Sequence, residues 1–577
     1  MIFKFFILYF LTLQSLINTL ESDLPRKNEV KDLFDNYKGK IYTGYLKTES
    51  AENELFYLLS QSENNYQKDP LILWLEGGPG CSSLLGFLDK IGPIVTNEYS
   101  GKFIKNEFTW NKNASLLFID SPFEVGFSIY KSRKHHNDSS TALSLYHALK
   151  DFYEIFPDFK ENDLFISGTS YSGIYIPYLV QQIKGIDNKE KNSINLKGFI
   201  IGNPYTSEKI EYDDSFVDTA YTHGLISLET YYEYLNICPH IDSIIDTLSN
   251  PNYTNNTNNH YVYQLNEESN EPIKYVTKQC NVYRKKIQET LYGINVFGIQ
   301  KICPYSDNIQ YNSNVFNDLN NAPFHQSENS FLKVFMRNLQ KRKKIKINLK
   351  NQYQKKTNEE LEKAISFIND SKLCKDDLFL EEFLNNETIK EKLGVNKSLN
   401  WKKCIDFDYK LGDATNFYKE HLNKLNNFKS WIYSGTEDLV SPTLGTIQWI
   451  GLEKFNISSK WDLWKYNNQI KGSFQNYTNG LNIYTLKGAG HNAVADKREE
   501  VKYLFDLFLK SDYPVKDNDN INPEKKSNWI YIVLGIISFL IVLFGVFLLF
   551  RWISRSRNKL NEETINEINN SGALTQE

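Results

Sequence analysis

The chain has 577 residues, a net charge of −4 at pH 7 and 41% hydrophobic residues. This apolar content is sufficient for a large folded body, which argues against disorder over most of the chain. Lysine and arginine nearly balance aspartate and glutamate, so the basic surface of a nucleic-acid-binding protein is not expected.

The first 20 residues predict a cleaved secretory signal. Lys4 precedes the apolar run 5–11, and Gln14 and Asn18 interrupt the pattern well short of the roughly 20 residues that span a bilayer. An N-terminal membrane anchor is the alternative. The signal predicts a place in the secretory pathway, in the Golgi or a related lumen, with vacuole, lysosome and cell surface as other destinations.

A second apolar run, residues 529–550, predicts a transmembrane helix. It contains no charged residue and is long enough to cross about 30 Å of hydrocarbon. Basic residues are more numerous after it than before it, which predicts a cytosolic tail at 551–577 and a lumenal location for everything upstream. Residues 513–528 become a juxtamembrane linker in this type I, single-pass layout.

A lumenal location has two further consequences. Asparagine sequons become candidate glycan sites, at Asn113, Asn252, Asn386, Asn456 and Asn476. The six cysteines become disulfide candidates, with 15 connectivities among which the sequence alone does not choose.

Short apolar strands alternate with helices over residues 71–183. Strands are predicted at Leu71–Leu75, Ser115–Ile119 and 164–166, and helices at 139–156 and 175–183. This alternation indicates a parallel α/β sheet.

The same pattern returns late in the chain, with strands at 430–433 and 481–486 and a helix at 499–509. The region between, about 213–424, is more polar and is predicted to be an insertion that caps the sheet. Within it, residues 327–359 are rich in lysine. They are either an exposed loop that is excised at basic residues or a solvated charge run.

The sequence Gly-Thr-Ser-Tyr-Ser-Gly at 168–173 lies between a predicted strand and a predicted helix, as a nucleophile elbow does. Gly168 and Ser172 are small enough for the strained backbone of such a turn, although the strict pattern has glycine at 172. Ser170 is therefore the candidate nucleophile.

A glycine-rich loop, residues 76–83, follows the strand at 71–75. The backbone N–H groups of Gly78 and Tyr171 are predicted to form a two-donor oxyanion hole. A phosphate-binding loop is the alternative, but the segment lacks the Lys-Ser/Thr ending that such a loop requires.

In hydrolases of this type the acid and the base follow the serine, in the order Ser, Asp, His. Asp438 lies in a turn after the strand at 430–433, and His491 follows Gly488-Ala489-Gly490 after the strand at 481–486. Ser170, Asp438 and His491 are the predicted triad, and neither a cofactor nor a metal site is predicted.

These motifs resemble the serine carboxypeptidase family from about residue 31 to residue 511. The resemblance is carried by Trp74–Ser83, Gly168–Gly173, Gly435–Asp438 and Gly488–His491, with subsidiary matches at Ile119–Pro122, Ile201–Asn203 and Trp401–Cys404. It implies an α/β-hydrolase fold with a mixed, mostly parallel sheet, and removal of single residues from peptide C-termini. Together with the signal and the transmembrane run, it predicts a lumenal serine carboxypeptidase domain at 21–512. The C-terminal anchor resembles that of Golgi carboxypeptidases that trim prohormones.

The resemblance also implies three disulfides, Cys81–Cys404, Cys238–Cys280 and Cys303–Cys374. The last of these brackets the lysine-rich loop. Plant members of the family lose a linker there, which favours excision.

The chain departs from the family where the substrate α-carboxylate is recognised. Glu76, Thr169 and Lys90 stand at positions that hold Asn, Glu and Glu in the family. We expect Lys90 to bind the terminal carboxylate as a charge pair while Glu76 orients it; alternatively, the two residues only neutralise each other. Residue preference does not follow, because Asn492-Ala493-Val494 replaces the family's Met-Val-Pro.

The favoured function is a serine-type carboxypeptidase that acts on peptide or protein C-termini through an acyl-enzyme. One alternative is an esterase or acyltransferase of the same superfamily. The other is a membrane receptor that kept the fold and lost the chemistry.

Overall fold

The computed structural model describes residues 24–301, 376–516 and 540–561, with gaps at 36, 51–52, 98–101, 131–135, 188–193, 208–209, 212–214, 239–263, 266–271, 274–277, 292–293, 406–408, 411–412, 426, 541 and 560. The predicted signal, the lysine-rich loop at 327–359, Cys303 and Cys374 lie outside the described residues. The chain divides into two compact units, Met1–Pro514 and Val515–Glu577.

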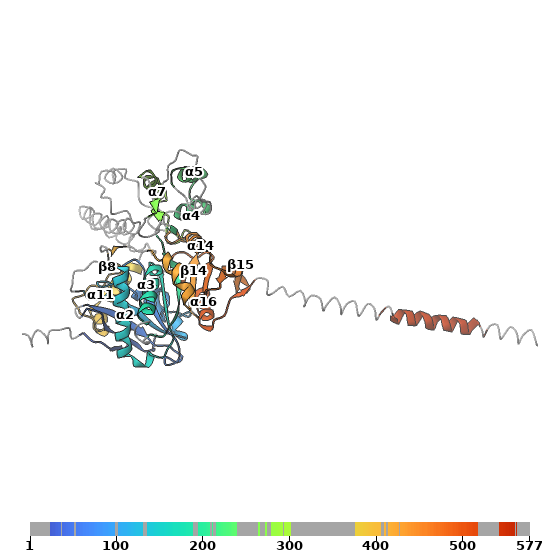
Figure 1. Ribbon diagram of the computed structural model, residues 1–577. Coiled ribbons are helices and arrows are strands. Elements are labelled where there is room, and N and C mark those ends of the chain that lie inside the picture. The colour runs from blue at the N-terminus through green and yellow to red at the C-terminus, as the bar shows by residue number, and fades with distance from the viewer. Residues whose placement is uncertain are drawn as a thin grey trace, which may run out of the picture. The chain divides into compact units, whose positions relative to one another are not determined.

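A mixed sheet forms the centre of the first unit (Figure 1). Its strands lie in the order β1 (Asn28–Val30), β2 (Ile41–Lys47), β3 (Glu54–Ser60), β7 (Ser115–Ile119), β4 (Leu71–Leu75), β9 (Leu164–Ser170), β10 (Leu196–Pro204), β14 (Lys429–Gly435), β17 (Leu481–Leu486), β16 (Gln469–Tyr477) and β15 (Ile457–Tyr466). Neighbours from β7 to β17 pair in parallel, and the outer strands pair antiparallel.

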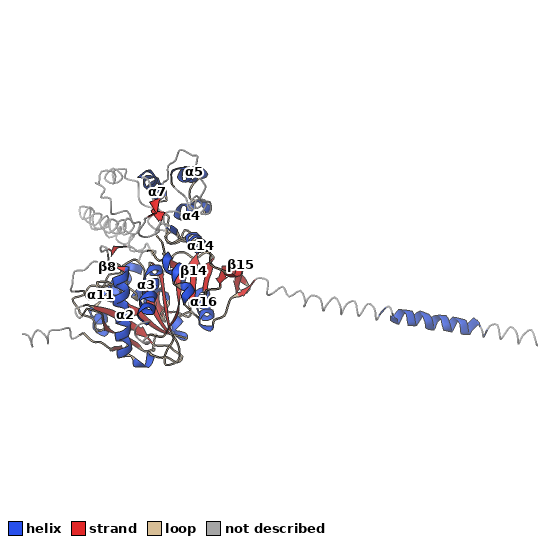
Figure 2. Ribbon diagram, viewed as in Figure 1, coloured by secondary structure: helices blue, strands red, loops and turns tan. Residues whose placement is uncertain are grey.

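Helices cover both faces of this sheet (Figure 2). Successive residues of a strand point to opposite faces, so Leu71 and Leu73 of β4 join one core while Ile72 and Trp74 join the other. The first core includes residues of α2 (Asp138–Ile155), α3 (Ser172–Asp187), α13 (Thr415–Glu420) and α14 (Thr443–Leu452), and the second includes residues of α16 (Arg498–Lys510). Burial on both faces explains why β4 and β7 are uninterrupted apolar runs.

The structure divides the predicted insertion into two parts. Its first part, with α4 (Ser215–Thr222), α5 (Leu228–Ile237) and α7 (Lys278–Thr290), forms a small core that includes Leu439, just after β14. In Figure 1 these helices lie above the sheet, as a cap would. The later part, with α11 (Asp376–Asn385) and α12 (Glu387–Lys392), packs into the second core instead, because Leu380 and Leu384 are apolar and buried there.

The candidate glycan sites differ in exposure. Asn113, Asn386 and Asn456 are exposed, whereas Asn476 lies in β16 with 7% of its surface accessible. Asn252 lies outside the described residues. The folded chain therefore has no room for a glycan at Asn476.

In the second unit, residues 542–559 are helical, and large apolar side chains on this helix are exposed, among them Leu543, Phe544, Phe547 and Phe550. Residues 529–539 of the predicted span lie outside the described residues. Among the described residues, no helix combines the length and apolar character that crossing a membrane requires.

Candidate active site

Ser170 ends β9, where a sharp turn leads into α3. Its φ of +62° lies in the left-handed region that residues with a side chain rarely adopt, so the turn is strained. The neighbouring positions are closely packed: a Cβ on Gly168 would lie 2.2 Å from the Leu75 carbonyl oxygen, and the Ser172 hydroxyl donates to Thr169 O at 2.8 Å. This is the geometry of a nucleophile elbow.

Asp438 and His491 lie on separate loops that follow β14 and β17. His491 Nδ1 is 2.7 Å from Asp438 Oδ2. The carboxylate is fully buried and accepts three further hydrogen bonds, from Asn203 Nδ2 at 2.9 Å and from the backbone N–H groups of Val440 at 2.7 Å and Ser441 at 3.2 Å. Donors around an ionised carboxylate hold it in one orientation, so Nδ1 keeps the imidazole proton and Nε2 is left to accept one.

Asn203 is a site residue that the sequence motifs did not single out. It lies near the end of β10 with φ +41°, and its Oδ1 accepts a hydrogen bond from Gly435 N at 3.2 Å while its Nδ2 donates to Asp438. The side chain therefore joins β10 to the loop after β14. The one sequence signal was the subsidiary family match at Ile201–Asn203, which carries no role by itself.

The glycine-rich loop after β4 lies directly against the elbow. A Cβ on Gly77 would lie 2.7 Å from both Ser170 Cβ and Tyr171 N, so only glycine permits this approach. The next residue, Gly78, has φ +122° and precedes a cis bond to Pro79. The loop thus comes close to the N–H of Tyr171, the other predicted oxyanion donor.

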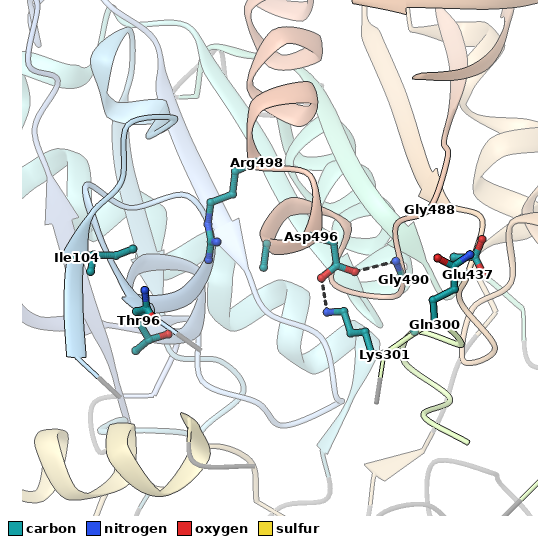
Figure 3. Close-up of a pocket in the computed structure, with 12 residues that line it drawn as sticks. Thr96, Ile104, Gln300, Lys301, Glu437, Gly488, Gly490, Asp496 and Arg498 are labelled. Atoms are coloured by element: carbon teal, nitrogen blue, oxygen red, sulfur yellow. Dashed lines mark hydrogen bonds and ion pairs between the residues drawn. The ribbon is translucent and has the colours of Figure 1, made fainter. Parts of the chain in front are cut away.

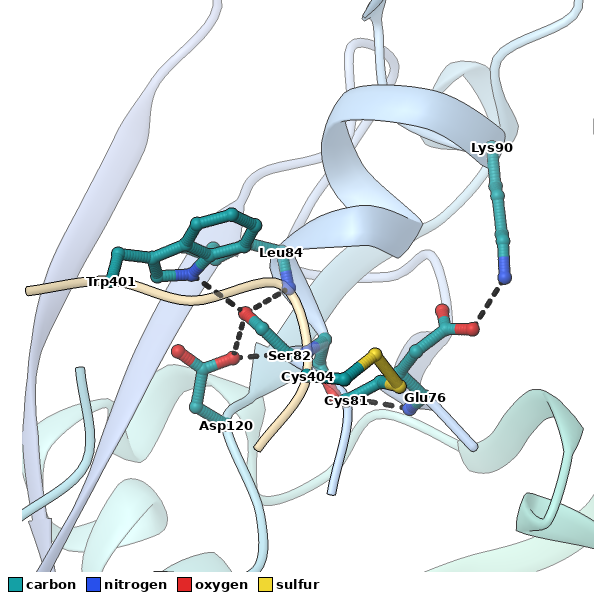
Figure 4. Close-up of a disulfide and its surroundings, with 9 residues drawn as sticks. Glu76, Cys81, Ser82, Leu84, Lys90, Asp120, Trp401 and Cys404 are labelled. Carbon is teal, nitrogen blue, oxygen red and sulfur yellow. Dashed lines mark hydrogen bonds and ion pairs between the residues drawn. A yellow bond between two sulfur atoms is a disulfide. The ribbon is translucent and has the colours of Figure 1, made fainter. Parts of the chain in front are cut away.

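A disulfide between Cys81 and Cys404 holds this loop to the later part of the insertion (Figure 4). Beside it, Ser82 N donates to Lys403 O at 2.9 Å, and the Ser82 hydroxyl donates to buried Asp120. Burial raises the pKa of Asp120 to about 6. A second disulfide, Cys238–Cys280, lies in the first part of the insertion.

The residues predicted to recognise the terminal carboxylate are engaged with other groups in this structure. Lys90, at the end of the helical turn η1 (Gly86–Lys90), forms an ion pair with Glu76, and each residue is 6% exposed (Figure 4). Glu76 Oε2 also accepts a hydrogen bond from Trp74 Nε1 at 3.1 Å. The Thr169 hydroxyl donates to Gly202 O at 3.0 Å.

A cavity of about 360 Å³ is lined by residues that adjoin Asp438 and His491 in the chain (Figure 3). Glu437 and Gly490, which directly precede Asp438 and His491, both line it. Its other charged lining residues are Lys301, Asp496 and Arg498.

The chain is similar to known serine carboxypeptidases. A model of the serine carboxypeptidase family matches residues 33–511. Serine carboxypeptidase-like 21 of Arabidopsis thaliana is 28% identical over 86% of this chain and 97% of its own length, and serine carboxypeptidase 1 of Hordeum vulgare is 28% identical over 84% and 93%.

Among solved structures, a prohormone-processing carboxypeptidase from Saccharomyces cerevisiae matches with a TM-score of 0.59 at 17% identity, over 84% of this chain and 96% of that one. This likeness concerns the fold, and it confirms the predicted α/β-hydrolase fold with a mixed, mostly parallel sheet. Because the family model covers most of the sequence, the chain belongs to the serine carboxypeptidase family and is a serine-type carboxypeptidase.

Proposed function

We propose that this carboxypeptidase removes single residues from peptide C-termini in the secretory pathway, with Ser170 as nucleophile, His491 as general base and Asp438 as the residue that orients the imidazole. The observation that carries the proposal is the 2.7 Å contact between His491 Nδ1 and a fully buried, hydrogen-bonded Asp438. A buried carboxylate in this arrangement stabilises the imidazolium that forms during catalysis.

In the proposed reaction, Ser170 Oγ attacks the carbonyl carbon of the last peptide bond while His491 Nε2 takes the hydroxyl proton. The N–H groups of Gly78 and Tyr171 donate to the oxyanion of the tetrahedral intermediate. His491 then gives its proton to the leaving amine, and the C–N bond breaks. Water then attacks the acyl-enzyme with His491 as base, the ester bond to Ser170 breaks, and the shortened peptide is released.

We propose further that Lys90 binds the terminal carboxylate and Glu76 orients it, next to Thr169. A lysine ammonium has three N–H donors, and Glu76 is the acceptor with which Lys90 pairs here, so donors are left for a substrate carboxylate. A charge pair of this kind needs no shared proton. We therefore expect substrate binding to persist toward neutral pH.

The first test uses the chain truncated before residue 529, with peptides that differ only in a free or an amidated C-terminus. Release of single residues from the free form alone supports the carboxypeptidase. Equal cleavage of both forms, or of neither, favours the alternatives. Ester substrates then separate an esterase or acyltransferase from a receptor without activity.

The second test addresses Lys90. Lys90→Met is expected to raise KM by at least about tenfold with little change in kcat, because a charge-assisted bond to the substrate is lost. That variant also leaves Glu76 buried and unpaired. The double variant Lys90→Met with Glu76→Gln removes both charges. An unchanged KM in this variant would contradict the proposal that Lys90 binds the terminal carboxylate of the substrate.

We also propose the lumenal placement and the C-terminal anchor at 529–550. The uncharged apolar run, the exposed apolar side chains on the helix at 542–559 and the two disulfides, which persist in oxidising compartments, support this arrangement. The full chain should resist alkaline carbonate extraction from membranes, and a chain that ends at 528 should be released. Recovery of the full chain in the soluble fraction would overturn the anchor.

A further inference from the structure

One segment of the insertion contacts both the loop that carries Asp438 and the loop that carries His491. We call this segment, residues 294–301, the strap. It makes three backbone hydrogen bonds to the loops: Leu439 N to Val296 O at 2.9 Å, Ile299 N to Glu437 O at 3.0 Å, and His491 N to Phe297 O at 2.7 Å. The strap therefore bonds to both chain neighbours of Asp438 and to His491 itself.

Side chains also connect the end of the strap to the loop that carries His491. Lys301 forms an ion pair with Asp496 Oδ1, and Asp496 Oδ2 accepts a hydrogen bond from Gly490 N at 2.8 Å (Figure 3). The Asp496 side chain is only 7% exposed, whereas that of Lys301 is 37% exposed. Asp496 thus links the strap to the residue directly before the general base.

These contacts matter because the loops border a cavity. Glu437, Gly490, Lys301 and Asp496 all line the cavity of about 360 Å³. The loop that carries His491 is also closely packed against the strap, because a Cβ on Gly490 would lie 2.1 Å from Phe297 O and 2.8 Å from Gly298 Cα. The position of this loop beside the cavity therefore rests on that packing together with its hydrogen bonds.

We propose that Asp496 is a positioning residue for His491. By accepting from Gly490 N–H and pairing with Lys301, it fixes the loop 488–491 against the strap and keeps the imidazole in contact with Asp438. Asp496 has no role in proton transfer itself. The inference rests on the proposed function, since its effect is read through the Ser170–His491 reaction.

The experiment compares variants of the full-length protein. Asp496→Ala removes both contacts and is expected to lower kcat by on the order of 100-fold, the size of effect that a displacement of about 1 Å produces. Asp496→Asn keeps an oxygen for Gly490 N–H but loses the charge, so a smaller loss is expected, as with Lys301→Met. Because these two variants break the same ion pair, their losses should not add in the double variant.

The matched control is Lys471→Met. It removes a comparably buried ion pair, Lys471–Glu500 at 3.0 Å, between β16 and α16. Its thermal midpoint should fall about as far as that of Lys301→Met, with kcat unchanged. This comparison separates positioning from general stability.

Labelling of Ser170 by an organophosphonate supplies a second readout, because its rate depends on activation by His491. The labelling rate should fall in parallel with kcat, while KM stays near that of the wild type. Three results would each overturn the proposal. The first is wild-type kcat and labelling in Asp496→Asn and Lys301→Met, the second is additive losses of kcat in the double variant, and the third is an equal loss of kcat in Lys471→Met. A wild-type protein with neither turnover nor labelling would overturn the proposed function, and this inference with it.

Discussion

Asn203 contacts Asp438, the proposed catalytic aspartate, from a neighbouring strand. Its amide donates to Asp438 Oδ2, the same oxygen that faces His491 Nδ1, and its carbonyl accepts from Gly435 N. One side chain therefore fixes both the carboxylate and the end of the strand that carries it. Nothing in its own sequence neighbourhood indicates this role, because both partners lie more than 200 residues away.

Asn203→Ala is expected to lower kcat by about tenfold, since the Asp438 carboxylate loses one of the donors that orient it. Asn203→Asp should lower kcat further, because a second carboxylate beside Asp438 raises the pKa of one member of the pair. Steady-state kinetics across pH measure both effects. Asn482→Ala, at a buried asparagine of β17, is the control, and equal kcat values in all three variants would contradict the assignment.

At the scale of elements, a buried carboxyl group joins the segment after β10 to α14. Glu211 accepts hydrogen bonds from Ser207 N at 3.1 Å and from Trp449 Nε1 at 3.2 Å, and it is fully buried. Burial is the main cause that raises the pKa of Glu211, to about 8. The folded chain therefore holds a proton on Glu211 at pH values where the unfolded chain, with a pKa of about 4.3, has lost it.

This difference makes stability depend on pH. The folded state binds more protons than the unfolded state between about pH 4.3 and pH 8, so the free energy of unfolding falls as pH rises through that window. Glu211→Gln should reduce the fall in thermal midpoint, most clearly between pH 6 and 8, above the range in which Asp120 contributes.

The comparison uses slopes rather than absolute midpoints, because the glutamine amide replaces one accepting oxygen by a donor. Calorimetry at pH 5, 6, 7 and 8 gives the slope of thermal midpoint against pH for the wild type and for Glu211→Gln. A variant with the slope of the wild type would show that Glu211 does not carry the dependence.

Elements buried on both faces were predictable from the sequence, and others were not. The strands β4, β7 and β17 have the predicted bounds, and α2 differs by one residue at each end. β10 was missed because Gly198, Gly202 and Pro204 interrupt its apolar pattern. The hairpin β15–β16 was missed because its side chains are largely polar and accessible.

At the scale of the whole molecule, the predicted triad could be found from the sequence, whereas the residues proposed to position it could not. The motifs around Ser170, Asp438 and His491 are local, so short stretches of sequence reveal them. Asp496 and Lys301 act through an ion pair between segments 195 residues apart, and such a contact has no local signature. The split of the insertion was equally hidden, because it depends on which core its apolar residues reach.

The disulfide Cys81–Cys404 spans 323 residues and encloses the whole lysine-rich loop. If that loop is excised, as one interpretation of 327–359 predicts, Ser170 and the strap belong to one product, and Asp438 and His491 to the other. Electrophoresis should then show one band without reductant and two with it, and the cut protein should keep its activity. A single band under reducing conditions in active protein isolated from its own cells would contradict excision.

Pairing of β10 with β14, the hydrogen bonds of the strap and this disulfide all cross between the two products. Cleavage would thus convert a single-chain hydrolase into a heterodimer in which neither subunit has a complete active site.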